Sequence, residues 1–159
     1  MIKMYNREKA VEYAKKWAFG RNPEFYDYTN IGGDCTNFAS QVLYAGYGVM
    51  NYKPIFGWYY IDGNRKSPSW TGVNELYSFV TSNRGAGPKA VEVDIDGIEP
   101  GDLVQLDFDG DGRFDHTPVI IDVGEYTPET ILLAAHTNDS LNRPLSTYGY
   151  RDIRFLHML

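Results

Sequence analysis

The sequence contains a single cysteine, Cys35, among its 159 residues. One cysteine cannot form an internal disulfide or supply a multi-cysteine zinc site, so neither is expected to stabilise this fold. Long apolar runs are also missing. No segment approaches the length of a transmembrane helix, and residues 1–18 carry charges where a signal peptide would have an apolar block. These absences predict no membrane insertion, in a chain that is either cytoplasmic or excised from a longer exported precursor.

Positive charge is also scarce. Lys and Arg total 15 against 21 Asp and Glu, which gives a net charge of −6. No basic run is present, so the sequence argues against nucleic-acid binding. Hydrophobic residues make up 43% of the chain and aromatic residues 15%, with 13 tyrosines. This composition is that of one globular domain spanning residues 1–159, and it leaves the oligomeric state open.

Helical periodicity is found in the first half of the chain. The spacing of apolar residues predicts helices over about 6–20, 35–45 and 73–81. Between the second and third lies an aromatic-rich loop, residues 49–70. Its rings are expected either to pack over the second helix or to line a groove.

From about residue 89 the apolar pattern changes to a period of two, which is typical of strands. The predicted strands are residues 90–94, 103–108, 117–123, 130–136 and 154–159. Helices followed by strands indicate an α+β fold, in which the N-terminal helices pack on a small curled antiparallel sheet or open barrel.

Cys35 follows Gly32, Gly33 and Asp34 and opens the second predicted helix. The positive end of a helix dipole stabilises a thiolate, so this position predicts a lowered thiol pKa. The Cys35 backbone N–H would also be free to bind an oxyanion, with a second donor left open between Asp34 and the first helix region. The alternative is structural: Asp34 caps the helix and Cys35 packs inward.

Three histidines are candidate bases for this thiol. His116 begins the predicted strand 117–123, and His136 ends the next one. If a hairpin turns near residues 126–127, residues of equal parity share a face, so His136 or Asn138 would lie beside His116. His157 lies in an apolar terminal strand and is interpreted as structural.

The acidic loop before His116 resembles the first half of a calcium-binding EF-hand loop. Asp107, Asp109, Asp111 and Asp115 stand at the first, third, fifth and ninth positions. The twelfth position is Pro118, where an EF-hand has a bidentate Glu. A tight acidic hairpin without calcium is therefore the preferred interpretation.

Residues 32–41, GGDCTNFASQ, resemble the nucleophile motif of the bacterial putative amidase domain family. That family is related to the NlpC-like and CHAP-like papain-fold cysteine hydrolases of cell walls. The similarity covers nearly the whole chain, because segments 5–14, 99–103, 115–116 and 136–139 resemble further family motifs in the same order. It implies a papain-like, NlpC-like fold.

By this resemblance, Cys35 is the nucleophile and His116 is the general base and then the general acid. NlpC-like enzymes place a polar residue, often His, on the following strand, which selects His136 as the third residue. Papain-like enzymes use Asn, which would favour Asn138, and Asp139 lies in the same segment. The resemblance implies no required cofactor.

The function expected from the resemblance is that of a cysteine amidase or endopeptidase. It would cleave peptidoglycan stem or crossbridge peptides through a thioester, in the cell wall or outside the cell if the chain derives from an exported precursor. Two alternatives stay open: an amidase or deamidase of another substrate, as in a toxin or effector, and an inactive cell-wall binding module. The net charge of −6 gives no electrostatic attraction to an anionic wall.

Overall fold

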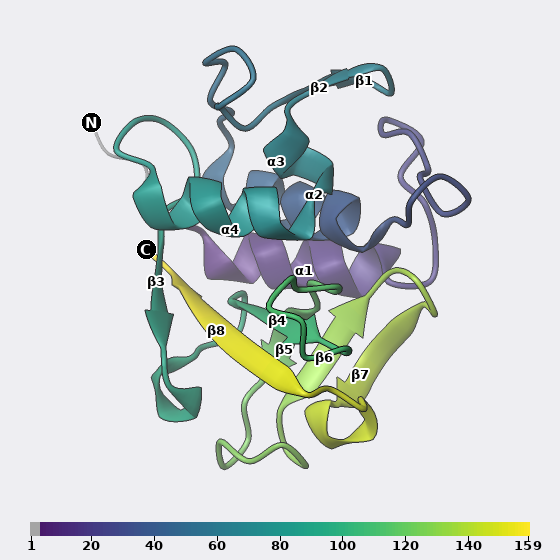
Figure 1. Cartoon of the computed structure of the whole chain (residues 1–159), viewed down its shortest axis with the longest axis vertical. Coiled ribbons are helices and arrows are strands. Elements are labelled where there is room, and N and C mark those ends of the chain that lie inside the picture. Colours follow the sequence, from purple (N-terminus) through teal and green to yellow (C-terminus); the bar gives the residue numbers. More distant parts are fainter. Residues whose placement is uncertain (1–3) are drawn as a thin grey trace.

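The computed structural model describes residues 4–159 of the expected domain, and residues 1–3 lie outside the described residues. The helices gather in one layer and the main sheet in another (Figure 1). The helices are α1 (Arg7–Trp17), α2 (Cys35–Tyr47), α3 (Pro68–Thr71) and α4 (Val73–Ser82). None of the helices in residues 4–159 has the length and hydrophobicity needed to cross a bilayer.

The main sheet has six strands in the order β3-β8-β4-β5-β6-β7, and every neighbouring pair is antiparallel. Its strands are β3 (Ala90–Val93), β4 (Leu103–Asp107), β5 (Val119–Asp122), β6 (Leu132–Ala135), β7 (Ser140–Pro144) and β8 (Asp152–Met158). A separate two-stranded sheet joins β1 (Tyr60–Asp62) and β2 (Arg65–Lys66), and short 3-10 turns form η1 (Ile95–Gly97) and η2 (Leu145–Thr147). The α+β class and the antiparallel sheet are therefore confirmed.

Two parts of the fold were not predicted from the sequence pattern. β7 is an edge strand whose residues are all half-buried or exposed, so it lacks the alternation that marks a strand. It also ends in Pro144, which edge strands tolerate because they have one unpaired side. The predicted loop 49–70 contains β1, β2 and most of α3, which are too short to produce a period.

α2 forms the centre of the helical layer. Ten of its residues are buried, including Phe38, Val42 and Leu43, because α1, α3 and the sheet cover it from different sides. It ends where Gly48 adopts φ 70° and donates its backbone N–H to the Tyr44 carbonyl. That left-handed conformation suits glycine, so the helix end is set by the local sequence.

The aromatic loop divides between core and surface. Trp58 and Trp70 are fully buried, and their indole N–H groups donate to Ser40 Oγ at 3.1 Å and Asn37 Oδ1 at 2.8 Å on α2. Tyr52 is 65% exposed and Phe56 74% exposed. The tryptophans therefore pack against the helix that carries Cys35, and the exposed rings are available for contacts outside the domain.

A β-bulge changes the register between β5 and β6. Asp122 pairs with Leu132, but beyond the bulge Ile120 pairs with Leu133 and Val119 with Ala134. The extra residue in β5 shifts the pairing by one, which exchanges the two faces of one strand relative to the other. The bulge therefore changes which side chains lie together at the far end of this strand pair, where the candidate histidines are found.

Candidate active site

Cys35 is the first residue of α2 and is half-buried. Its sulfur lies 3.6 Å from Thr36 Oγ1 and also interacts with the backbone of Thr117, the first residue after His116. Thr36 Oγ1 and Thr117 Oγ1 are 3.2 Å apart, so the start of α2 contacts the strand segment that follows His116. Among the described residues, no acceptor takes the Cys35 backbone N–H, which leaves that donor free.

The pKa of the Cys35 thiol is raised, which corrects the expectation of a thiolate in the free protein. Burial is the largest cause, and the negative charge of Asp34 adds to it. Hydrogen bonds from the Thr36 side chain and from the Thr117 and Thr36 backbones act in the opposite direction but do not compensate. The helix-start argument considered only the dipole, whereas desolvation penalises the charged form more strongly here.

His116 is 5% exposed and lies just before β5, in the interior of the sheet, where its backbone bonds to Leu106 in β4. Its ring centroid lies 6.1 Å from that of Phe108 and 5.7 Å from that of Tyr148. Burial, with a smaller contribution from the positive charge of Arg143, lowers the pKa of His116 to about 4. No hydrogen bond of the ring is found within residues 4–159.

The structure therefore brings Cys35 and His116 into one neighbourhood without a hydrogen bond between their side chains. Thr117 directs its hydroxyl toward α2, whereas His116 lies against Tyr148. With a raised thiol pKa and a lowered imidazole pKa, both groups are neutral at neutral pH. Catalytic hydrogen bonds are often long in a free enzyme and shorten only when substrate binds.

His136 does not lie beside His116 as the sequence predicted. Its buried ring stacks on Phe38 at 4.0 Å, with Nδ1 2.5 Å from Asp34 Oδ2 and Nε2 2.8 Å from the Trp17 carbonyl. The expected pairing assumed a regular hairpin, but the bulge shifts the register. His116 instead pairs with Leu106 of β4, and no ring or hydrogen-bond contact joins it to His136 within residues 4–159.

The other third-residue candidates have different surroundings. Asn138 is exposed and adopts a left-handed φ of 57° in the turn between β6 and β7. Asp139 accepts two hydrogen bonds from Arg21, at 2.9 and 3.1 Å, and Arg21 Nη1 also lies 3.2 Å from His136 Nε2. Asp139 therefore belongs with Arg21 and His136, and no hydrogen bond joins either candidate to His116 within the described chain.

Asp34 is fully buried and makes no side-chain cap to α2. Its carboxylate instead accepts from the Tyr28 backbone N–H at 2.8 Å and the Asn37 amide at 2.9 Å, and it contacts the His136 ring. The residue before Cys35 is thus held by contacts with three other residues. This network fixes where α2 begins and where Cys35 lies.

The acidic loop is held by its own first aspartate. Asp107 accepts the backbone N–H groups of Asp109, Gly110 and Gly112, at 2.9 to 3.1 Å. Asp115 accepts the backbone N–H of Phe108, so its carboxylate also closes the loop. Within residues 4–159 no group of three or more His, Cys, Asp or Glu side chains is arranged to hold a metal, and these contacts support the acidic hairpin.

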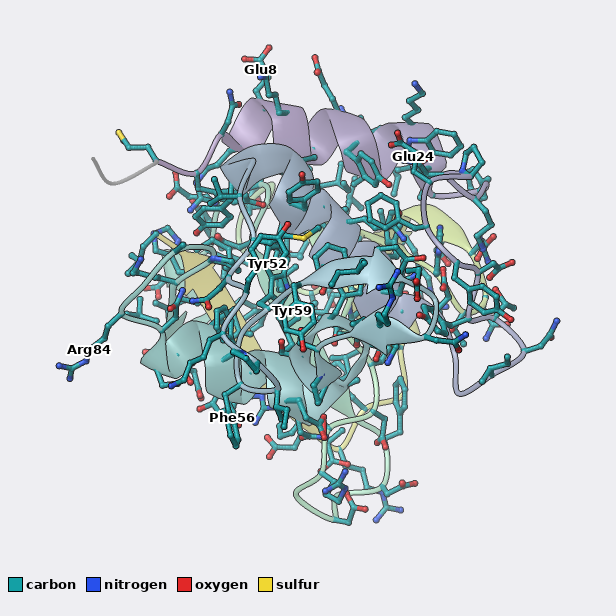
Figure 2. The ribbon with its side chains drawn as sticks, turned by 90° about the horizontal axis from the view of Figure 1, so that it is seen from above. Glu8, Glu24, Tyr52, Phe56, Tyr59 and Arg84 are labelled. Carbon is teal, nitrogen blue, oxygen red and sulfur yellow. The ribbon has the colours of Figure 1, made fainter. Side chains whose placement is uncertain are left out.

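A cleft of about 880 Å³ lies between α4 and residues 51–57, away from Cys35 and His116. Phe56 and Phe79 contribute apolar surface, and Lys53 and Arg84 contribute positive charge. Figure 2 looks down on this side, with Phe56 near α4 and Arg84 projecting outward. The exposed part of the aromatic loop therefore borders this cleft and not Cys35.

Several residues of this region were not singled out from the sequence. Thr36 and Thr117 contact the sulfur, and Tyr148 and Arg143 lie around His116. Threonine, tyrosine and arginine are common on protein surfaces and in turns, so their types alone carried no signal. Their roles arise from contacts between segments distant in the sequence.

Alkylation of the free protein by iodoacetamide tests the neutral thiol. We expect labelling of Cys35 to be slow at pH 7 and to accelerate only at pH values above the ordinary range for cysteine, because burial raises its pKa. The measurement is the labelling rate from pH 5 to 10, with urea-unfolded protein as the reference. Restricted access of iodoacetamide to the thiol would lower the labelling rate at every pH. A shift in the pH at which the labelling rate is half-maximal would instead report a changed thiol pKa. Fast labelling that does not vary between pH 5 and 8 would show a thiolate–imidazolium pair instead.

Comparison with known proteins gives one family and two curated relatives. The profile of the family described as "Putative amidase domain" matches residues 4–159. The uncharacterized protein YhbB of Bacillus subtilis (strain 168) is 40% identical over 120 residues, which cover 74% of this chain and 37% of that protein. The uncharacterized protein YjcM of the same organism is 25% identical over 150 residues, covering 90% of this chain and 33% of that protein. The chain thus matches about a third of each relative's length, and no solved structure matches it.

Proposed function

The chain belongs to the family described as "Putative amidase domain", and from this membership we propose that it is a cysteine-dependent amide hydrolase. Cys35 is the proposed nucleophile and His116 the proposed general base. The observation that carries the proposal is the approach of the single thiol, at a helix start with a free backbone N–H, to the strand segment next to a neutral, buried imidazole. A neutral imidazole is the form that accepts a proton from a thiol.

In the first half of the reaction, His116 takes the thiol proton as the Cys35 sulfur attacks the amide carbonyl carbon. The new C–S bond places negative charge on the carbonyl oxygen, and the free Cys35 N–H at the start of α2 stabilises that charge. His116 then returns its proton to the amine nitrogen as the C–N bond breaks. This leaves a thioester on Cys35 and a neutral amine product.

In the second half, His116 accepts a proton from water as that water attacks the thioester carbonyl. The C–S bond breaks, the sulfur recovers a proton from His116, and the carboxylic acid leaves. Both halves require His116 to alternate between neutral and protonated forms. No metal ligand or cofactor enters these steps.

The finer assignment is a papain-like fold, related to the NlpC-like and CHAP-like hydrolases. It is supported by a nucleophilic helix packed on an antiparallel sheet that carries the base just before β5. The substrate class that we propose is peptidoglycan stem or crossbridge peptides. This substrate class rests on the family resemblance, and the net charge of −6 gives no electrostatic attraction to an anionic wall. With this substrate the domain would act in the cell envelope.

The function is tested by incubating the protein with purified muropeptides and, in parallel, with unrelated peptide and carboxamide substrates. Mass spectrometry identifies the bond that is cleaved, and Cys35→Ala is the matched control. Cleavage of muropeptides by the wild type alone supports the wall assignment. If only the unrelated amides are cleaved, and cleavage requires Cys35, the peptidoglycan assignment is wrong and the cysteine mechanism is retained. Muropeptide binding without cleavage of any substrate would favour a binding module.

The lowered pKa of His116 predicts an acid-tolerant activity and an acid-sensitive fold. The acid limb of kcat/KM should lie near pH 4, because His116 stays neutral down to about that value. The neutral ring contributes stability that is present above the unfolded pKa, about 6.5, and is lost as pH falls through the folded pKa. We expect a loss of about 3 kcal/mol in unfolding free energy from this group.

Urea unfolding at pH 7, 5 and 4, compared with His116→Gln, isolates this contribution. The glutamine variant should lose less stability than the wild type as the pH falls, because it has no ring to protonate. Parallel pH dependences for the two proteins would contradict the lowered pKa of His116.

A further inference from the structure

The hydroxyl of Tyr148 is the one fully enclosed side-chain polar atom in residues 4–159 that has no hydrogen-bond partner. Tyr148 itself is 9% exposed. An unpaired buried hydroxyl is costly, because it gives up its bonds to water without replacement. A phenylalanine would fill the same space without that cost, so the hydroxyl needs an explanation beyond packing.

Tyr148 follows η2, in the connection between β7 and β8 (Figure 1). Its ring centroid lies 5.7 Å from that of His116, and the Arg143 guanidinium lies 3.7 Å from its centroid on the ring face. Burial raises the pKa of Tyr148, the charge of Arg143 and side-chain contacts with Ser140 and Arg143 act in the opposite direction, and Cys35 adds a smaller rise. The hydroxyl is therefore neutral and shares the neighbourhood of both proposed catalytic groups.

The proposed reaction requires a hydrogen-bond acceptor beside the His116 ring. When His116 accepts the thiol proton, both ring nitrogens carry hydrogens, and only one of them faces the reacting atoms. The surroundings disfavour this cation, because burial and the charge of Arg143 already lower the pKa of His116 to about 4. An acceptor for the second N–H would orient the ring and stabilise its protonated form.

We propose that the Tyr148 hydroxyl is this acceptor, and thus the third member of the site and the positioning residue for His116. The inference rests on the proposed function of Cys35 and His116. In this proposal Tyr148 takes the role of third residue that the sequence suggested for His136. The two ring nitrogens of His136 already face Asp34 and the Trp17 carbonyl. The His116 and Tyr148 rings have centroids 5.7 Å apart, and neither the His116 ring nor the Tyr148 hydroxyl makes a hydrogen bond of good geometry within residues 4–159. On substrate binding the hydroxyl would turn toward the His116 ring.

Tyr148→Phe removes only the hydroxyl. We expect kcat to fall about 10- to 100-fold with KM nearly unchanged, and the acid limb of kcat to move to lower pH, because the imidazolium loses its acceptor. The melting temperature should stay the same or rise, since the lost hydroxyl has no partner. Alkylation of Cys35 at pH 7 should be unchanged.

The matched control is Tyr47→Phe. The buried Tyr47 hydroxyl donates to the Leu159 carbonyl at 2.6 Å. Its loss should lower the melting temperature and leave kcat and the pH profile at wild-type values. Both variants thus remove a tyrosine hydroxyl. Tyr148→Phe should lower activity without lowering stability, and Tyr47→Phe should lower stability without lowering activity.

Wild-type kcat and pH profile in Tyr148→Phe would overturn the proposal. So would a fall in kcat that accompanies a fall in melting temperature as large as that of Tyr47→Phe, because that pattern is structural. Nitrogen-15 and ring-proton shifts of His116, measured at pH 7 and on acidification, provide a readout without substrate. If the wild type hydrolyses no amide, the proposed function fails, and these shifts still decide the contact. A change of the His116 shifts in Tyr148→Phe, but not in Tyr47→Phe, supports the contact between Tyr148 and His116. Identical spectra of Tyr148→Phe and the wild type overturn that contact.

Discussion

Replacing Cys35 by alanine is expected to abolish amide hydrolysis, with kcat falling by at least about 10⁴-fold. The chain has one cysteine, so no second thiol can form the thioester. The residual rate would come only from binding and from the free N–H at the start of α2, which the substitution leaves in place. The measurement is single-turnover product formation on whichever substrate the wild type cleaves.

The control for this variant is its fold. Cys35 is half-buried at the first position of α2, and alanine is a good helix former, so the circular dichroism spectrum and melting temperature should remain close to those of the wild type. Cys35→Ser tests the same point with nearly unchanged volume. Hydrolysis by Cys35→Ala at more than a tenth of the wild-type rate would remove the sulfur from the mechanism.

Replacing Asp34 by alanine is expected to cost about 3 to 5 kcal/mol of stability, since it breaks a buried charged contact. The fully buried carboxylate accepts from the Tyr28 N–H and from Asn37, and it lies 2.5 Å from His136 Nδ1 and 3.7 Å from Arg21 Nε. Without it, the Tyr28 N–H and one hydrogen of the Asn37 amide lose their acceptor, and the His136 ring loses its carboxylate contact. The melting temperature should fall by roughly 10 °C.

The control for Asp34 is Asp62→Ala. Asp62 pairs with Arg65 at 2.7 Å, but both side chains are largely exposed, so its loss should not change the melting temperature measurably. A double-mutant cycle of Asp34→Ala with His136→Ala should give a coupling of about 0.5 to 3 kcal/mol, as expected for residues in direct contact. Additive effects in that cycle would contradict the buried contact.

The main elements of the fold were predictable because they depend on local signals. The apolar period located α1, α2 and α4 within a few residues, and Asn6 and Gly48 mark a helix start and a helix end by their side-chain and backbone chemistry. The same period located five of the six strands of the main sheet. β7 was missed because the residues of this edge strand do not alternate between buried apolar and exposed polar side chains.

The candidate site was predictable in part. Cys35 at a helix start and His116 at a strand start follow from the sequence, and the structure brings their segments together. The expected neighbourhood of His116 and His136 did not follow, because an extra residue in β5 changes the register between β5 and β6. A bulge of this kind has no reliable pattern in one sequence, so the resulting neighbours were not predictable.

By itself the sequence determined the α+β class, a single thiol at the start of a helix and the absence of an internal disulfide. Each of these depends on composition or on residues close together in the chain. Only the tertiary structure decided that Cys35 is a neutral thiol, that His136 binds Asp34, and that Tyr148 lies against His116. The physical reason is that pKa values depend on burial, and contacts depend on strand register. Both arise only when distant segments pack together.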